Sequence, residues 1–324
     1  MITLRADAGT MARVRFSFSP AQEVMAWLKL TAKGDRHPVF GDPGPSARAA
    51  LAHPDVELVS DLLPPDGATY VPDLLTPRPG AGGSCGELFD EQLAAVESTS
   101  QDDLESQVCA SISTYWGRPA PVAVQRRMEA GDLPKRLAAG LGRFWREALA
   151  DSWPALQPVI DRDIADRAAV LVSFGLGRLL NSVHPGIAWT GDAVTIDKPW
   201  TGEIDVTGRE LVLAPGVLGG PSLLVQVDKP DEVVLYVPVR KAGAGTRRHC
   251  GRLAAVIGET RAILLDELEG ARSTTDLARR LGYAPGTISY HLGAMHRVGL
   301  VTKRREGRQV LYTRTSQAQA LLSE

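Results

Sequence analysis

The chain has 324 residues, 44% of them hydrophobic and 23% charged, with a formal net charge of −2. This length exceeds that of a single small domain and predicts two to three domains with a well-formed core. The sequence has no apolar run of membrane-spanning length, and its first residues lack the apolar segment of a signal peptide. We therefore expect a cytoplasmic protein that does not contact a membrane.

Charge is distributed unevenly along the chain. Residues 240–324 contain 15 Lys and Arg against 7 Asp and Glu, a formal charge of +8, so residues 1–239 carry −10. A basic end favours contact with a polyanion such as nucleic acid, and an acidic remainder is repelled by it.

The three cysteines are widely separated and do not indicate a disulfide framework. They are Cys85, Cys109 and Cys250, an odd number in a compartment expected to be reducing. His249 and Cys250 are neighbours, but no spacing typical of a metal site surrounds them. We expect no metal and no cofactor.

The first expected elements are a strand and a helix. Val14, Phe16 and Phe18 alternate with polar residues and predict a strand over residues 13–19. Ser19-Pro20 then begins a helix that runs to about Lys33.

Residues 34–83 are rich in Pro and Gly, and short helices are expected near residues 46–52 and 56–62. The Gly-rich segment 80–86 lacks the Lys-Ser/Thr pair and the preceding strand of a phosphate-binding loop. We interpret it as a flexible connection. Helical periodicity then predicts helices over residues 87–97, 102–115, 121–129, 134–153 and 155–183.

After Asn181 the pattern changes to short β-type runs, which predict one small antiparallel sheet. The runs are residues 187–189, 194–196, 203–206, 210–213, 223–227 and 233–239. The expected fold class is α+β: an N-terminal domain over 13–240, helical over 20–183 and β-rich over 187–240. A polar linker, 241–251, precedes a C-terminal domain over 252–324.

The C-terminal domain begins with an expected helix over residues 252–269. A second helix carries Leu277 and Leu281, with Thr275 as its predicted N-cap and Gly282 as its end. Pro285-Gly286 separates this helix from a third, expected to start near Thr287.

The third helix has two different faces. Ile288, Leu292, Met295 and Gly299 share one face, which we expect to be packed. The opposite face has small or hydrogen-bonding side chains, which allow a helix to approach base edges in a groove. These are Tyr290, Gly293 and Arg297, flanked by Thr287 and Ala294, with Ser289 and His291 on the flanks.

Two β-prone runs, 300–305 and 309–314, enclose Glu306-Gly307 and predict a hairpin rich in Lys and Arg. A short helix over 316–322 follows. The order helix, turn, helix and basic hairpin is typical of a winged helix-turn-helix. Helix-turn-helix units also occur as packing modules, but the complete order favours DNA binding.

Residues 253–322 resemble the DNA-binding domain of ArsR-type (ArsR/SmtB) bacterial repressors. The matching residues are Leu277-Ala278, Leu281-Gly282, the run 287–292, Gly299-Leu300-Val301, and Arg305-Glu306-Gly307-Arg308 with Tyr312. The resemblance implies a homodimer, a recognition helix over about 285–298, and repression of transcription relieved by an effector. Metal-sensing members carry cysteines on the first helix of the motif, and residues 275–281 have none.

The pattern and the resemblance together predict a surface of the protein that binds double-stranded DNA. Its residues are Thr275, Pro285, Gly286, Thr287, Ser289, Tyr290, His291, Arg297, Lys303, Arg304, Arg305 and Arg308. Residues 13–240 bear a looser resemblance to the long N-terminal region of some ArsR-type regulators, with no activity implied.

Two alternatives concern residues 13–240. They could form an enzyme tethered to DNA, although the sequence has no nucleophile elbow, HExxH or dinucleotide fingerprint. They could instead only build the dimer. We favour a domain that senses an effector, such as a small molecule, or a partner, because a mixed helical and sheet domain of this size usually has room for a pocket. An apolar cavity lined by Trp or Tyr would support this interpretation.

Overall fold

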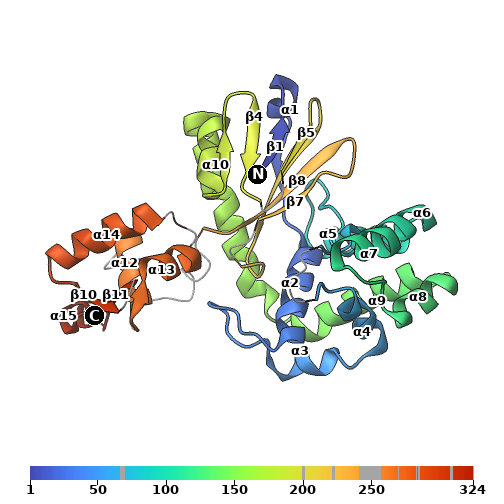
Figure 1. The fold of residues 1–324 in the computed structure, drawn as a ribbon, viewed down its shortest axis with the longest axis horizontal. Helices are drawn as coiled ribbons and strands as arrows, with labels where there is room; N and C mark the ends of the chain where they lie inside the picture. Colours follow the sequence, from blue (N-terminus) through green and yellow to red (C-terminus); the bar gives the residue numbers. More distant parts are fainter. Residues whose placement is uncertain are drawn as a thin grey trace. The chain divides into compact units, whose positions relative to one another are not determined.

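The structure is a computed structural model of the whole chain. It describes residues 1–65, 70–198, 201–220, 223–240, 257–268, 270–281, 283, 285–306 and 309–323. Figure 1 shows the fold and labels its elements.

The chain forms two compact units whose segments alternate along the sequence. The helical unit comprises Arg5–Ala165 and Asp205–Val237. The C-terminal unit comprises Met1–Leu4, Asp166–Ile204 and Pro238–Glu324. The linker expected at 241–251 lies outside the described residues, so the domain boundaries expected from the sequence stay predictions.

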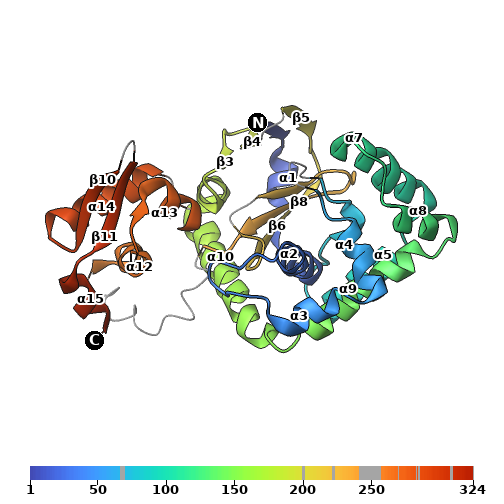
Figure 2. The same ribbon diagram turned by 60° about the horizontal axis from the view of Figure 1, so that its bottom comes forward.

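The helical unit is built around α2 (Pro20–Lys33). Ser19 caps this helix by accepting a hydrogen bond from the backbone N–H of Gln22, and Gly34 ends it with φ 67°. This confirms the helix predicted from Ser19-Pro20. Figure 2 looks nearly along α2, whose neighbours are α3 (Gly44–Ala50), α4 (Pro54–Asp61), α5 (Cys85–Glu97) and α9 (Leu133–Ala148).

The closest helix packing is between α4 and α9. Gly140 on α9 faces the backbone of Asp55 on α4, so closely that an added Cβ would overlap the Asp55 carbonyl oxygen. A glycine is therefore required at this crossing, because any side chain would separate the two helices.

The remaining helices of this unit are short. The segment expected as one helix over 102–115 is divided in three, with a wider π-helical turn, Glu105–Ser111, in the middle. The flanking helices are α6 (Gln101–Leu104) and α7 (Ile112–Trp116). The others are α1 (Ala8–Ala12), the 3₁₀ turn Asp73–Leu75 and α8 (Val122–Glu129).

A four-stranded sheet with strand order β2-β6-β8-β7 completes the helical unit. Its inner strands each contain five consecutive buried residues, as expected for strands covered on both faces. β2 pairs with β6 in parallel, and β7 pairs with β8 antiparallel. The strands are β2 (Val14–Phe16), β6 (Glu210–Gly216), β7 (Leu224–Gln226) and β8 (Glu232–Pro238).

Glu23 on α2 is bound to the loop that follows β6. Its carboxylate oxygens accept hydrogen bonds from the backbone N–H groups of Val217 (2.6 Å) and Leu218 (2.8 Å). The side chain is 2% exposed, and burial raises its pKa to about 7.

The C-terminal unit contains a second four-stranded sheet with strand order β3-β4-β1-β5. The strands are β1 (Ile2–Arg5), β3 (Ile187–Trp189), β4 (Ala193–Ile196) and β5 (Gly202–Asp205). Strand β1 therefore lies between strands that are distant from it in sequence.

The long helix α10 (Trp153–Val183) is interrupted at Gly175, where φ is 77° and ψ is 172°. Only glycine adopts this backbone conformation readily. Arg167 on the same helix is fully buried and donates hydrogen bonds to the carbonyl oxygens of Val183 (3.3 Å) and Pro238 (2.9 Å).

The sequence prediction of one antiparallel sheet after Asn181 was wrong. All six runs form strands, but they divide between two sheets, and β2 adds a parallel pair. The N-terminal strands β1 and β2 enter the two sheets, and an alternating pattern carries no information about the partner of a strand.

The C-terminal residues form a three-stranded sheet, order β10-β11-β9, with helices packed against it. The elements are α12 (Glu259–Glu267), β9 (Arg272–Ser273), α13 (Thr274–Leu281), α14 (Pro285–Arg297), β10 (Val301–Glu306), β11 (Gln309–Arg314) and α15 (Ser316–Ser323).

None of the helices in the described part of the chain is both long enough and apolar enough to span a bilayer.

Candidate nucleic-acid interface

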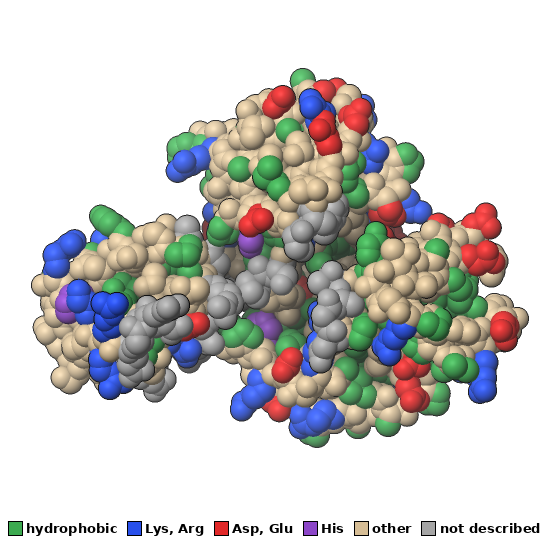
Figure 3. Space-filling view, viewed as in Figure 1, with side chains coloured by type: hydrophobic (Ala, Val, Ile, Leu, Met, Phe, Trp, Pro, Cys, Tyr) green, Lys and Arg blue, Asp and Glu red, His purple; other side chains and the backbone are tan. Residues whose placement is uncertain are grey.

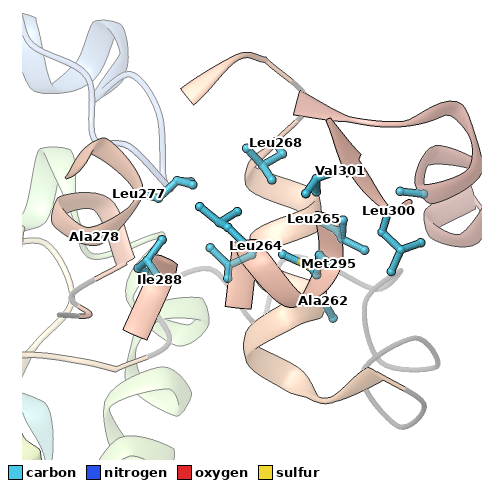
Figure 4. Close-up of a cluster of buried hydrophobic side chains, with 12 residues drawn as sticks. Ala262, Leu264, Leu265, Leu268, Leu277, Ala278, Ile288, Met295, Leu300 and Val301 are labelled. Atoms are coloured by element: carbon cyan, nitrogen blue, oxygen red, sulfur yellow. The ribbon is translucent and has the colours of Figure 1, made fainter. Parts of the chain in front are cut away.

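The helix-turn-helix has its own hydrophobic core. Figure 4 shows apolar side chains of α12, α13, α14 and the start of β10 gathered between these elements. Each element contributes at least one fully or almost fully buried residue, so the helices hold one another in place. The core residues are Ala262, Leu264, Leu265, Leu268, Leu277, Ala278, Ile288, Leu292, Met295, Leu300, Val301 and Ala318.

The first helix of the motif is capped by Ser273 rather than by Thr275. The Ser273 hydroxyl accepts a hydrogen bond from the backbone N–H of Asp276 (3.1 Å) and donates one to the Asp276 carboxylate (2.6 Å). Thr275 lies inside α13 and is exposed. The prediction of Thr275 as N-cap was wrong because three neighbouring residues, 273–275, all have hydroxyl side chains suited to this position.

The second helix of the motif, α14, begins at Pro285, two residues before the predicted start. Ile288, Leu292 and Met295 are buried against α12 and α13, as their spacing predicted. The opposite face points to solvent: Tyr290 is 66% exposed, and Thr287 and Arg297 are also exposed. This leaves one free helix face of the kind that enters a major groove.

Gly299 does not belong to the buried face, contrary to the sequence prediction. It is exposed and has φ 76°, which places it in the left-handed conformation that ends a helix. The backbone N–H of Leu300 donates to the Met295 carbonyl oxygen at 2.9 Å. The chain therefore reverses here and enters the hairpin.

The hairpin pairs β10 with β11 antiparallel, as predicted, with Lys303 opposite Tyr312 and Arg305 opposite Val310. Short β9 extends the sheet on the other side of β11. Lys303, Arg304 and Arg305 are exposed along β10. Figure 3 shows Lys and Arg side chains gathered over this part of the C-terminal unit.

Most of the predicted contact residues therefore lie on the exposed surface of α14 and β10, where a duplex could reach them. Thr275 is exposed on α13, and His291 is half-buried on α14. Arg308 lies outside the described residues. Their contacts with DNA stay predictions. The other exposed residues are Pro285, Gly286, Thr287, Ser289, Tyr290, Arg297, Lys303, Arg304 and Arg305.

One residue that the sequence did not single out is Arg261 on α12. Its positive charge acts on the imidazole of His291, and the pKa of His291 is lowered by burial first and by Arg261 second. Arg261 is followed by apolar Ala262 and Ile263, and nothing in the spacing links it to residue 291. Only the packing of α12 against α14 reveals the pair.

Two cavities in the helical unit lack the apolar, aromatic lining that would support effector sensing. One, of about 430 Å³, lies between α4, α8 and α9 and has charged walls that include Glu57, Asp61 and Arg126. The other, of about 310 Å³, is lined by His53, Arg143 and Arg146 among others. Neither has a Trp or Tyr in its wall. Among the described residues, no group of three or more His, Cys, Asp or Glu could hold a metal ion.

Comparison with known proteins identifies the helix-turn-helix. Residues 259–304 match a family model described as a helix-turn-helix domain, which spans α12, α13, α14 and the first part of β10. No curated protein and no solved structure matches the chain. The chain thus carries a helix-turn-helix DNA-binding domain near its C-terminus.

Proposed function

We propose that this protein is a sequence-specific DNA-binding transcriptional regulator of the ArsR type that acts as a repressor. The observation that carries the proposal is the free face of α14 beside a basic hairpin. Tyr290, Thr287 and Arg297 point away from the core, and Lys303, Arg304 and Arg305 lie exposed on β10. A helix supplies base contacts and a cationic ribbon supplies phosphate contacts in such complexes.

We further propose that it binds its operator as a homodimer. An isolated helix reads few base pairs, and two helices related by a two-fold axis read a palindrome. The resemblance to ArsR-type repressors supports this assembly. The acidic charge of residues 1–239 supports a role for the rest of the chain away from the duplex.

We also propose that the N-terminal region senses an effector and does not catalyse a reaction. The two cavities of the helical unit have charged walls, which would suit a polar molecule better than an apolar one.

The decisive experiment is capture of genomic DNA fragments by the purified full chain, followed by measurement of its affinity for the enriched sequence. We expect enrichment of a palindromic site, and we expect T287A/R297A to lose preference for that site. A matched pair in the helical unit, R36A/R118A, removes two exposed arginines that line neither cavity and should keep the preference. Capture of random fragments would contradict the proposal.

A further inference from the structure

The larger cavity of the helical unit is a groove of about 430 Å³ between α4, α8 and α9, three helices that contact one another (Figure 2). This volume is in the range of small-molecule sites, about 300–1,000 Å³. Pro54, Leu58 and Ala123 form the apolar part of its wall. The rest of the wall carries charged side chains from all three helices, so the ion pairs within the protein decide which charges a ligand can use.

Some of these charges are already paired within the protein. Nη1 of Arg136 on α9 lies 2.7 Å from a carboxylate oxygen of Asp55 on α4. Nη1 of Arg127 on α8 and Nε of Arg136 lie 3.2 Å and 3.4 Å from one oxygen of Asp132, the residue before α9. This network links the three helices around the groove and uses up the charges of Asp55, Arg127 and Arg136.

Two carboxylates in the wall have no ion pair among the described residues. They are Glu57 and Asp61, both on α4. Their spacing of four residues places them on the same face of the helix, where two like charges repel each other. In agreement with this, the pKa of Asp61 is raised by burial and then by Glu57. Cations bound beside the two carboxylates would remove this repulsion.

Arg126 on α8 is the opposite charge in the same wall. It is exposed in the last turn of its helix and, like Glu57 and Asp61, has no ion pair in the part of the chain that the structure describes. A guanidinium binds a carboxylate through two parallel hydrogen bonds. The groups available to a ligand are thus two negative charges and one positive charge, a net charge of −1.

We propose that this groove binds the effector, and that the effector is a small molecule with one carboxylate and two cationic groups, the chemical class of the basic amino acids. This inference rests on the proposed function, which assigns effector sensing to the N-terminal region. The carboxylate of the ligand binds Arg126, and its two cationic groups bind Glu57 and Asp61. The methylene chain between the cationic groups contacts the apolar wall at Leu58. The charges of ligand and groove then cancel.

Other charged metabolites fit this wall less well. An amino acid with a single ammonium group leaves one of the two carboxylates unpaired. A diamine has no carboxylate and brings a positive charge next to Arg126. A dicarboxylate is repelled by Glu57 and Asp61. The number and sign of the charges therefore give the groove its specificity.

The first test is isothermal titration calorimetry of L-lysine, L-ornithine and L-arginine into the purified full chain, without DNA. The matched probes are the decarboxylated forms, cadaverine, putrescine and agmatine, and L-norleucine, which has no side-chain ammonium. We expect a basic amino acid to bind, and its decarboxylated form and L-norleucine to bind about tenfold more weakly, because each lacks one charged contact. If no basic amino acid binds to the folded chain, the proposal is overturned.

Substitutions then assign each charge to its partner. R126Q should weaken binding of the basic amino acid about tenfold and should not weaken binding of its decarboxylated form. E57Q and D61N should each weaken binding of both. R118Q and E129Q remove exposed charges outside the groove and should leave both affinities unchanged. Equal losses for both ligands in R126Q, or wild-type affinity in E57Q and D61N, would refute this site.

The last test couples the ligand to DNA. Saturation with the tightest-binding basic amino acid should change the affinity of the full chain for the captured operator by about fivefold or more. R126Q should need about tenfold more ligand for the same change. An unchanged operator affinity at saturation would overturn the effector role. If the wild type binds the ligand but no specific DNA, the proposed function fails and the effector role fails with it, whereas the ligand site is confirmed by calorimetry alone.

Discussion

Glu23 is a carboxyl group fully buried in the helical unit, with two backbone N–H donors from Val217 and Leu218. These donors favour the ionised form, but burial outweighs them and raises the pKa of Glu23 from 4.5 to about 7. In the unfolded chain the group ionises near pH 4.5. The folded state therefore binds more protons than the unfolded state between these two pH values.

We predict that Glu23 makes the free energy of unfolding decrease as pH rises from about 4.5 to 7 and adds no further change above that range. The decrease is on the order of 3 kcal/mol, because one pKa unit corresponds to about 1.4 kcal/mol. Urea unfolding of wild type and E23Q at several pH values measures it. The difference in unfolding free energy between wild type and E23Q should decrease by this amount over the same pH range. If that difference does not change with pH, the assignment is refuted.

Gly140 provides a second prediction at the residue scale. G140A places a Cβ onto the carbonyl oxygen of Asp55 and 3.0 Å from Val59 Cγ2, which should destabilise the helical unit by about 3 kcal/mol. The control is G86A on the exposed side of α5, where an added Cβ meets nothing within 4 Å. That change should be neutral or stabilising by about 0.5 kcal/mol. Chemical denaturation compares the two, and equal stabilities would show that α9 can move away from α4.

At the scale of a single element, two hydroxyl residues near the start of α13, Ser273 and Thr275, have different roles. Ser273 makes the capping hydrogen bonds, and Thr275 is exposed within the helix. S273A should cost about 1 kcal/mol of stability in the C-terminal unit. T275A should change stability little. Hydrogen exchange of the α13 amides distinguishes them, and greater loss of protection in T275A would restore Thr275 as the cap.

The hairpin yields a prediction about salt. Each phosphate contact contributes about 0.9 to the slope of log affinity against log salt concentration. R304A/R305A should therefore reduce that slope by about 2 and weaken binding to all sequences alike. R36A/R118A removes the same charge from the helical unit and should leave the slope unchanged. A wild-type slope in R304A/R305A would show that β10 does not lie on the phosphate backbone.

Local sequence patterns predicted the positions of most helices and strands well, but not which strands pair or which helices pack together. Ser19-Pro20 correctly gave the start of α2, whose end was correctly expected at about Lys33, and the 288–292–295 spacing correctly gave the buried face of α14. The two sheets were missed because β1 and β2 pair with strands almost 200 residues away. The Arg261–His291 pair was missed for the same reason: it is made by the packing of helices 30 residues apart.

At the scale of the whole molecule, a homodimer would present two copies of α14 to one face of the duplex. Their half-sites should lie about one helical turn apart, roughly 10 bp centre to centre. Footprinting on the captured operator should show protection symmetric about a dyad. Inserting 5 bp at the dyad rotates one half-site to the other side of the duplex and should abolish cooperative binding. Undiminished binding would favour a monomer.

The alternation of the two units along the chain limits what the sequence could reveal about domains. A change in composition marks a domain boundary only when each unit is one continuous segment of the chain. Here the chain passes between the units at residues 4, 165, 204 and 237. The acidic part of the sequence (1–239) and the basic part (240–324) therefore do not coincide with the two units, because Asp166–Ile204 belongs to the same unit as the basic part.

The central position of β1 also has a consequence for biosynthesis. Ribosomes make β1 about 190 residues before β4 and about 200 residues before β5, the two strands that flank it. Its backbone donors and acceptors must wait, paired only with water, until both neighbours have left the exit tunnel. The sheet around β1 therefore cannot complete its hydrogen bonds until residue 205, the last residue of β5, has been synthesised.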